Sequence, residues 1–157
     1  MSYGYPLEPR HVTSYRANLS APEVIGPVAE GLRFNIYVTG GELAGPKIKG
    51  KLRSVGADWL TIRTDGVGIL DVRATIETHD GALIYTTYRG VAQLGEDGYK
   101  NFLDGVPPPA AGIPLRIHPV YQTSHPAYLW VNRAFCIGVG KAFLDQSYVS
   151  YDIYEIA

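Results

Sequence analysis

The sequence predicts an all-β protein, folded as a closed antiparallel up-and-down barrel of about eight to nine strands with one short helix. Three observations support this fold class. The 157 residues include 18 Gly and 11 Pro, which indicate many turns. They also include 12 Tyr, and these accompany frequent Val, Ile and Thr, which favour strands. Finally, the β-rich runs follow one another through short connections. Closing such a meander removes its exposed edges, although a β-sandwich of the same strands is the alternative.

The elements are expected in the following order along the chain. Residues 1–30 are expected to be irregular because prolines interrupt them, with one strand-like stretch at 12–19. Residues 31–157 are expected to form the barrel, so that residues 1–157 make a single domain. The expected helix is 96–103, and the expected strands are 32–38, 47–53, 59–64, 68–78, 82–91, 115–123, 127–139 and 147–156. The segment Gly56-Ala57-Asp58 is expected to end the second of these strands.

The clearest local signal is a hairpin between residues 68 and 91. His79-Asp80-Gly81 separates its two runs, and the Asp80-Gly81 pair within it suits a two-residue turn with positive φ. Counting back from that turn predicts a mainly apolar face and a face with a charged row. The apolar face holds Val72, Ala74, Ile76, Leu83, Tyr85 and Arg89; the other holds Asp71, Arg73, Thr75, Glu77, Ile84, Thr86 and Tyr88. A slip of one residue would exchange these faces, so the prediction depends on the turn.

Charge and hydropathy exclude several classes of partner. Lys and Arg total 14 against 15 Asp and Glu, so no basic surface is expected to attract nucleic acid. No apolar run is long enough to cross a bilayer, and Met1–Pro6 does not resemble a secretory signal. Cys136 is the single cysteine and allows no internal disulfide. We therefore expect a cytoplasmic protein without nucleic-acid or membrane partners.

Metal, cofactor and covalent chemistry have no recognisable motif in this sequence. No Gly-x-Ser-x-Gly segment is present, and Gly138-Val139-Gly140 lacks the third glycine of a dinucleotide site. The histidines do not have the spacing of zinc ligands; they are His11, His79, His118 and His125. We therefore predict neither a metal nor a cofactor.

Asp71 and Arg73 form the first candidate site. They lie two residues apart, so they share one face of a strand, and Tyr88 is predicted opposite Arg73. A carboxylate beside a guanidinium can orient a polar ligand, and a tyrosine can donate a hydrogen bond to it. The alternative is a surface ion pair on the solvent side of the barrel.

Tyr128, Trp130 and Asn132 form the second candidate site. They alternate along the predicted strand 127–139, so they are expected to share a face. Two aromatic rings and an amide would make a wall for a ligand. The alternative is core packing with satisfied polar tips.

Tyr85 and Arg89 form the third candidate site, on the apolar face of the hairpin. If that face lines the barrel, Arg89 must lie near a mouth or bind an anion, because an unpaired buried charge is costly. Together with Trp59, Asp58 and His118, these residues would form a pocket for a small, partly apolar acid or phenol. An imidazole titrates near neutral pH, which suits His118 to acid/base catalysis, although a structural role is the alternative.

A set of motifs recurs in a familiar order and spacing. They are Gly40-Gly41-Glu42-Leu43-Ala44-Gly45-Pro46, Gly56-Ala57-Asp58-Trp59, Asp65-Gly66-Val67, Leu70-Asp71-Val72-Arg73, Asp80-Gly81-Ala82-Leu83-Ile84-Tyr85, Tyr128-Leu129-Trp130-Val131-Asn132-Arg133 and Asp152-Ile153-Tyr154-Glu155. In these motifs the chain resembles the bacterial "domain of unknown function 3237" family, which is UPF0311-like, across residues 27–157. The resemblance implies a small β-barrel and supplies no reaction or active site.

These observations predict a barrel that binds a small molecule. We expect a cofactor-independent isomerase, cyclase or lyase that acts on a small aromatic or alicyclic metabolite. The expected catalytic residues are His118, Asp71 and Arg73, and the expected substrate-binding residues are Tyr85, Arg89, Tyr128, Trp130, Asn132 and Trp59. A non-catalytic ligand-binding protein and a structural barrel are the alternatives. A homo-oligomer is also expected, because apolar outer stripes would be buried between copies.

Overall fold

One antiparallel sheet of nine strands makes up most of the chain. The strands are β1 (Pro9–Leu19), β2 (Glu23–Val28), β3 (Gly31–Ala44), β4 (Gly50–Ile62), β5 (Val67–Thr78), β6 (Leu83–Gln93), β7 (Ile113–Gln122), β8 (Cys136–Phe143) and β9 (Tyr148–Ile156). The helices are α1 (Gly98–Leu103) and two 3₁₀ segments, η1 (Pro126–Arg133) and η2 (Leu144–Gln146). This computed structural model describes residues 1–157.

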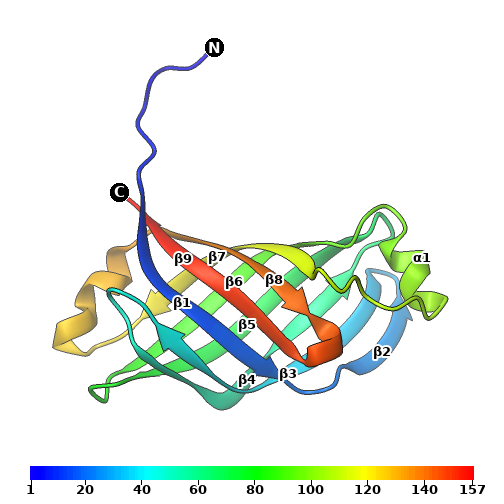
Figure 1. Ribbon diagram of the computed structural model, residues 1–157, viewed down its shortest axis with the longest axis horizontal. Helices are drawn as coiled ribbons and strands as arrows, with labels where there is room; N and C mark the ends of the chain where they lie inside the picture. The colour runs from blue at the N-terminus through cyan, green and yellow to red at the C-terminus, as the bar shows by residue number, and fades with distance from the viewer.

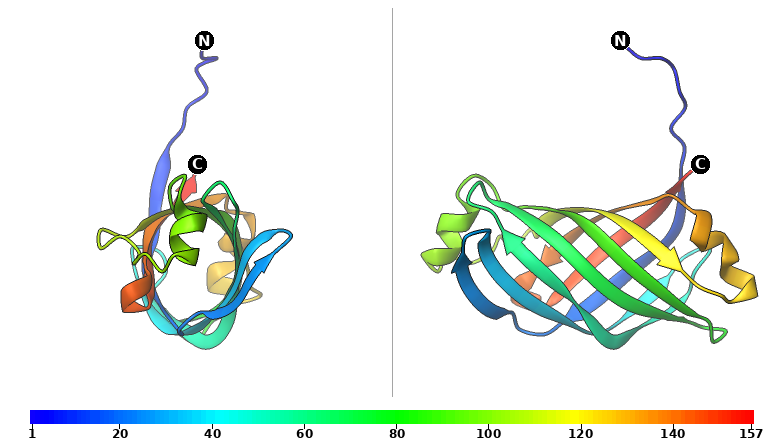
Figure 2. Two further views of the ribbon diagram at one scale, coloured as in Figure 1. Left: turned by 90° about the vertical axis from the view of Figure 1, so that its right-hand side faces the viewer. Right: turned by 180° about the vertical axis from the view of Figure 1, so that it is seen from behind.

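The sheet closes on itself. Strands β3 to β9 are sequential neighbours, and β9 pairs with β1. β1 then pairs with the second half of β3, from Val38 to Ala44, and this pairing completes the ring (Figures 1 and 2). The predicted up-and-down barrel is confirmed: eight strands form the ring, and β2 is an extra strand beside the first half of β3.

The interior of the barrel is filled largely by alternate residues of each strand. β7 alternates buried and exposed side chains without interruption from Ile113 to Gln122, as expected for a strand with one face on a core. Leu32, Ile84 and Ile153 are completely or almost completely buried, and each such side chain contributes about 1.5–3 kcal/mol of transfer free energy.

The two ends of the barrel carry the helical segments. α1, which confirms the predicted short helix, lies across one end, and η1 lies at the opposite end (Figure 1). The view along the barrel in Figure 2 places α1 in front of the opening at its end. None of these helices combines the length and the apolar character that a bilayer span requires.

The irregular conformation expected for residues 1–30 is wrong from Pro9 onward. β1 forms hydrogen-bonded ladders with both β9 and β3, so the barrel depends on it for closure. β2 accommodates Gly26 and Pro27 because it pairs only with β3 and has one free edge. Proline lacks an N–H and is tolerated at such an edge.

The predicted hairpin register is wrong by one residue. Thr78 N donates to Ala82 O at 2.9 Å, so His79, Asp80 and Gly81 form a three-residue turn instead of a two-residue turn. Gly81 has a φ of 88° at the last position of this turn, where a left-handed conformation is required. The side chain of Thr78 also accepts from Ala82 N at 2.8 Å and fixes the longer turn.

This shift exchanges the two faces of β6. Val72 pairs with Tyr88 and Ala74 with Thr86, so Tyr88 and Thr86 point inward. Leu83, Tyr85 and Arg89 belong instead to the outer face, where they are exposed.

The strand predicted at 127–139 is also wrong in its first half. Residues 126–133 form η1, and β8 begins only at Cys136. Pro126 occupies the first turn of η1, where its missing N–H costs nothing. His125 caps this turn by accepting from Ala127 N at 3.2 Å. Tyr128, Trp130 and Asn132 therefore do not share the face of a strand.

Candidate functional site

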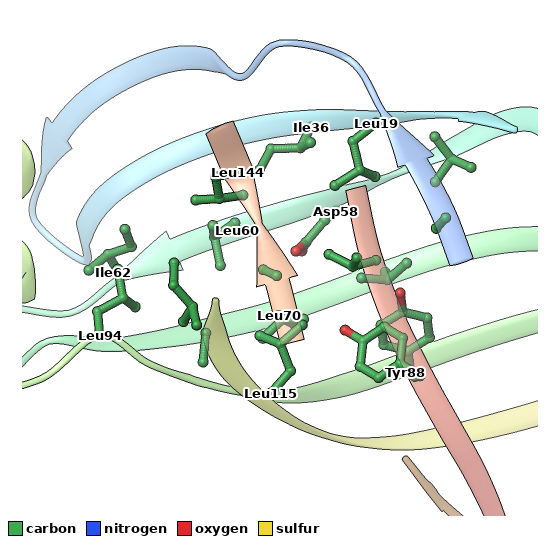
Figure 3. Close-up of a pocket in the computed structure, with 18 residues that line it drawn as sticks. Leu19, Ile36, Asp58, Leu60, Ile62, Leu70, Tyr88, Leu94, Leu115 and Leu144 are labelled. Carbon is green, nitrogen blue, oxygen red and sulfur yellow. The ribbon is translucent and has the colours of Figure 1, made fainter. Parts of the chain in front are cut away.

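A cavity occupies the half of the barrel nearest α1. Its inner chamber has a volume of about 60 Å³, and 17 of its 18 lining residues are hydrophobic. Asp58 is the exception, and its carboxyl points into the chamber (Figure 3). Small side chains from three strands, Ala17, Ala92 and Ala142, leave part of this space open.

An outer chamber of about 480 Å³ continues the cavity toward the end of the barrel. Phe102 of α1 and the segment from Gly105 to Pro109 form its outer wall. The inner and outer chambers share six lining residues, so they are parts of one space: Ile36, Leu60, Ile62, Leu94, Ile113 and Leu144.

Asp58 faces inward because of an irregularity in β4. The register between β4 and β5 shifts between Leu52 and Gly56, and Gly56 has a φ of 95°. A Cβ at this position would lie 2.0 Å from the carbonyl oxygen of Arg73, so glycine alone fits the bend. Beyond the bend, Asp58 lies in the same inward phase as Leu60 and Ile62. The strand end predicted at Gly56-Ala57-Asp58 is therefore wrong: β4 bends at Gly56 and continues through these residues.

The carboxyl of Asp58 has an unusual environment. Burial raises its pKa from 3.8 to about 7, because the ionised form loses hydration. The backbone N–H of Asp71 donates to Asp58 Oδ1 at 3.1 Å and opposes the increase, whereas the negative charge of Asp71 adds to it. At neutral pH this carboxyl is therefore present in both protonation states.

Two tyrosines complete the polar end of the inner chamber. Tyr88 of β6 and Tyr151 of β9 have ring centroids 5.8 Å apart, and Tyr15 of β1 packs behind Tyr151 at 5.0 Å. Burial raises the pKa of both Tyr88 and Tyr151, and the charge of Asp58 adds to each increase, so Asp58 lies within electrostatic reach of both. We call Asp58, Tyr88 and Tyr151 the polar floor.

The hydroxyl of Tyr151 is buried without a hydrogen-bond partner. A buried polar group without a partner costs about 1–3 kcal/mol, so a ligand oxygen that accepted its hydrogen bond would recover that free energy. The polar floor can therefore donate hydrogen bonds to an oxygen and exchange a proton through Asp58.

None of the nine residues expected to be catalytic or substrate-binding lines the two chambers, although Asp58, which was grouped with the third candidate site, does line the inner one. Asp71 lies on the outer face between Arg73 and Arg89, at N–O distances of 3.8 and 3.7 Å. Both arginine side chains are more than half exposed, so these contacts are solvent-screened ion pairs. Tyr88, which was expected beside Arg73, is on the other side of the barrel wall.

His118, Trp59 and Tyr85 also lie outside the lumen. His118 pairs with Arg89 across β6 and β7, its ring stacks on Phe135 at 4.5 Å, and its Nδ1 lies 2.8 Å from Cys136 O. Trp59 packs edge-to-face with Tyr37 at 6.0 Å, and Tyr85 is exposed.

Tyr128, Trp130 and Asn132 lie at the end of the barrel opposite α1. Tyr128 Oη donates to Asp80 Oδ1 at 2.7 Å, which ties η1 to the β5–β6 turn. The Asn132 amide accepts from Thr123 N and donates to Thr123 O at 2.9 and 2.8 Å. Lys47 Nζ lies 5.0 Å from the Trp130 ring centroid. Each of these contacts holds a loop in place.

The sequence carries a signal for two residues of the polar floor, of which only Asp58 was among the residues expected at the third candidate site. Asp58 alternates with Leu60 and Ile62, so a carboxyl interrupts an apolar strand face. Tyr151 alternates in the same way with Val149 and Ile153. No three His, Cys, Asp or Glu side chains lie together as potential metal ligands.

Known proteins include chains that are similar to this one in sequence and in fold. It is 29% identical over 150 residues to a UPF0311 protein of Rhodopseudomonas palustris strain TIE-1, covering 96% of this chain and 97% of that protein. It is also similar to a beta-barrel-like protein from Acinetobacter baumannii, with a TM-score of 0.83, 28% identity, and coverage of 99% of this chain and 100% of the other. An enzyme from Penicillium herquei shares the fold, with a TM-score of 0.73, 18% identity, and coverage of 100% of this chain and 99% of that one.

The family comparison agrees with the motifs described above. The model of the family described as "Protein of unknown function (DUF3237)" matches residues 7–156, which is nearly the whole chain and includes the N-terminal strands. The protein therefore belongs to the DUF3237 family.

Proposed function

We propose that the barrel is an enzyme that binds a small aromatic or alicyclic molecule in its lumen and moves a proton on it. The reaction would be that of an isomerase, cyclase or lyase that uses side chains of the protein without a cofactor. The observation that carries this proposal is a single carboxyl in an otherwise apolar chamber, with its pKa raised to about 7. Perturbed carboxyls of this kind are characteristic of catalytic sites.

Each residue of the polar floor has a role in this chemistry. Ionised Asp58 removes a proton from carbon beside a substrate carbonyl, and the C–H electron pair forms a carbon–carbon double bond. The carbonyl oxygen becomes an enolate oxygen, to which Tyr88 and Tyr151 donate hydrogen bonds. Protonated Asp58 then returns the proton to another carbon, and the enolate electrons form the new C–H bond. The raised pKa of each tyrosine keeps its hydroxyl protonated, and therefore available as a donor.

The dimensions of the cavity support a ligand rather than a filled core. Ligand sites have volumes of about 300–1,000 Å³, and the outer chamber, at about 480 Å³, lies within this range. The inner chamber holds only a small group, which would be the reacting part of the substrate.

Deuterium exchange of a neutral bicyclic ketone tests the proposed function. We expect the protein to accelerate exchange of the C1 protons of 2-tetralone in D₂O, followed by proton NMR. Asp58→Asn should reduce the protein-dependent rate by about a hundredfold or more, because it removes the base and keeps the side-chain shape. Asp152→Asn, on the exposed outer face of β9, is the matched control and should keep the wild-type rate.

Two results would overturn the proposal. One is an exchange rate that is no faster with the wild-type protein than with Asp58→Asn. The other is equal loss of exchange in Asp152→Asn. If 2-tetralone binds without exchanging its protons, the data would favour a non-catalytic binding protein. The homo-oligomer and the cytoplasmic location stay predictions, and light scattering of the purified protein tests the former.

A further inference from the structure

The two chambers contain no cationic side chain. Among all residues that line them, none is Lys, Arg or His. Their acidic groups are Asp58 at the polar floor and Asp145 at the mouth. Arg89, the one cation expected to face the lumen, is exposed on the outer face and pairs with Asp71.

We propose that the cavity selects uncharged, elongated molecules that have an apolar body and enter with a hydrogen-bonding oxygen first. The exclusion of acids and phosphates follows from the chamber walls. The orientation of the oxygen rests on the proposed function of the polar floor.

The cavity is a poor environment for a bound anion. A carboxylate or phosphate inside the cavity would give up its hydration with no cation to replace it. It would also lie close to the carboxyl of Asp58, and like charges in a poorly hydrated site repel strongly. A neutral phenol or ketone avoids both costs. We therefore expect an acid to bind about a hundredfold more weakly than its neutral counterpart.

The polar groups of the cavity lie at its two ends. Asp58, Tyr88 and Tyr151 are at the inner end, and Asn101 and Asp145 are at the mouth. The six residues shared by the two chambers, which connect these ends, are all Leu or Ile. A molecule that spans the cavity must therefore be apolar in the middle, because any polar group there would lack a hydrogen-bond partner.

The mouth is built as a stiff apolar wall. Phe34 and Phe102 meet edge-to-face, with ring centroids 4.7 Å apart and an interplanar angle of 82°. Three consecutive prolines, Pro107 to Pro109, continue this wall, and their rings restrict the backbone. Such a preformed surface suits a rigid ring system, since little conformational freedom is lost on binding.

A matched pair of biphenyls tests the charge selection. Calorimetric titration at pH 7.5 compares 4-phenylphenol with biphenyl-4-carboxylate, which has the same ring system. The wild-type protein should bind the phenol about a hundredfold more tightly than the carboxylate. Leu94→Lys places a cation where the two chambers meet and should reverse this preference. Leu94→Met is the control for a change of shape alone and should keep it.

A second pair of variants tests the orientation. Tyr151→Phe should weaken the binding of 4-phenylphenol by about tenfold, whereas Asn101→Ala should leave it unchanged. The opposite result, dependence on Asn101 and not on Tyr151, would place the oxygen at the mouth and overturn the proposed orientation.

The outcomes separate this inference from the proposed function. Equal affinity of wild-type protein for the phenol and the carboxylate overturns the charge selection, even if Asp58-dependent exchange of 2-tetralone is observed. Selective binding of the phenol without such exchange overturns the proposed function alone. Binding of neither biphenyl overturns the cavity as a site for elongated neutral molecules.

Discussion

Asp58 should make the stability of this protein depend on pH in an unusual direction. Its pKa is raised from 3.8 to about 7 in the folded chain, so between these values the folded state binds more protons than the unfolded state. The stability linked to protonated Asp58 is complete below pH 3.8, declines as the pH rises, and is lost above pH 7. Most carboxyls act in the opposite direction, because partners lower their pKa.

The size of this effect follows from the same two pKa values. One pKa unit corresponds to about 1.4 kcal/mol, so ionised Asp58 costs the folded state about 4 kcal/mol at most. Between pH 5 and pH 8 the linkage relation gives a loss of about 2–3 kcal/mol. Asp58→Asn cannot ionise and keeps an oxygen that can accept from Asp71 N.

Urea unfolding of wild type and Asp58→Asn at pH 5, 6, 7 and 8 measures this difference. Wild type should lose about 2–3 kcal/mol relative to Asp58→Asn across this range. Asp152→Asn, on the outer face, should keep the wild-type dependence on pH. Parallel stability profiles for wild type and Asp58→Asn would refute the environment inferred for the Asp58 carboxyl.

Three further predictions concern single residues. Tyr151→Phe removes a buried hydroxyl without a partner, so the free energy of unfolding measured in urea should rise by about 1 kcal/mol; a decrease would show that the hydroxyl is hydrogen-bonded. In Gly81→Ala the added Cβ meets no atom within 4 Å, but the residue must adopt a φ of 88°. This substitution should therefore lower the free energy of unfolding in urea by about 1–2 kcal/mol. An unchanged value would contradict the turn. Cys136 is buried, and burial raises the pKa of its thiol to about 11. Mass spectrometry should therefore detect alkylation by iodoacetamide at pH 8 only after unfolding. Rapid alkylation of the folded protein would contradict its burial.

The barrel itself could be predicted because the sequence features that indicate it are local. Gly, Pro and Tyr content, alternating strands and short turns all point to a meander, and closure follows from the cost of exposed edges. The N-terminal strands were missed because their pairing is not local. β1 pairs with β9 at the other end of the sequence, and β2 contains a glycine and a proline that an edge strand tolerates.

The inward face of the hairpin depended on a detail that Asp80-Gly81 does not determine. This pair suits both a two-residue turn and the last two positions of a three-residue turn. The side chain of Thr78, which accepts from Ala82 N, supports the longer form. Because the observed register differs from the predicted one by one residue, Tyr88 lies in the lumen, and Tyr85 and Arg89 lie outside it.

The cavity could not be predicted from any single segment. It exists where small side chains of distant strands, Ala17, Ala92 and Ala142, come to lie around the same space. The sequence does show that Asp58 interrupts an apolar phase with Leu60 and Ile62. Its importance depends on that empty space, because burial beside a chamber is what raises its pKa.

The catalytic role of Asp58 can be tested by the pH dependence of 2-tetralone exchange. If Asp58 is the base, the protein-dependent rate should rise with pH, reach half of its maximum near the pKa of about 7, and disappear in Asp58→Asn. A rate that keeps its pH dependence in Asp58→Asn would show that another group transfers the proton, and would contradict the catalytic role proposed for the polar floor.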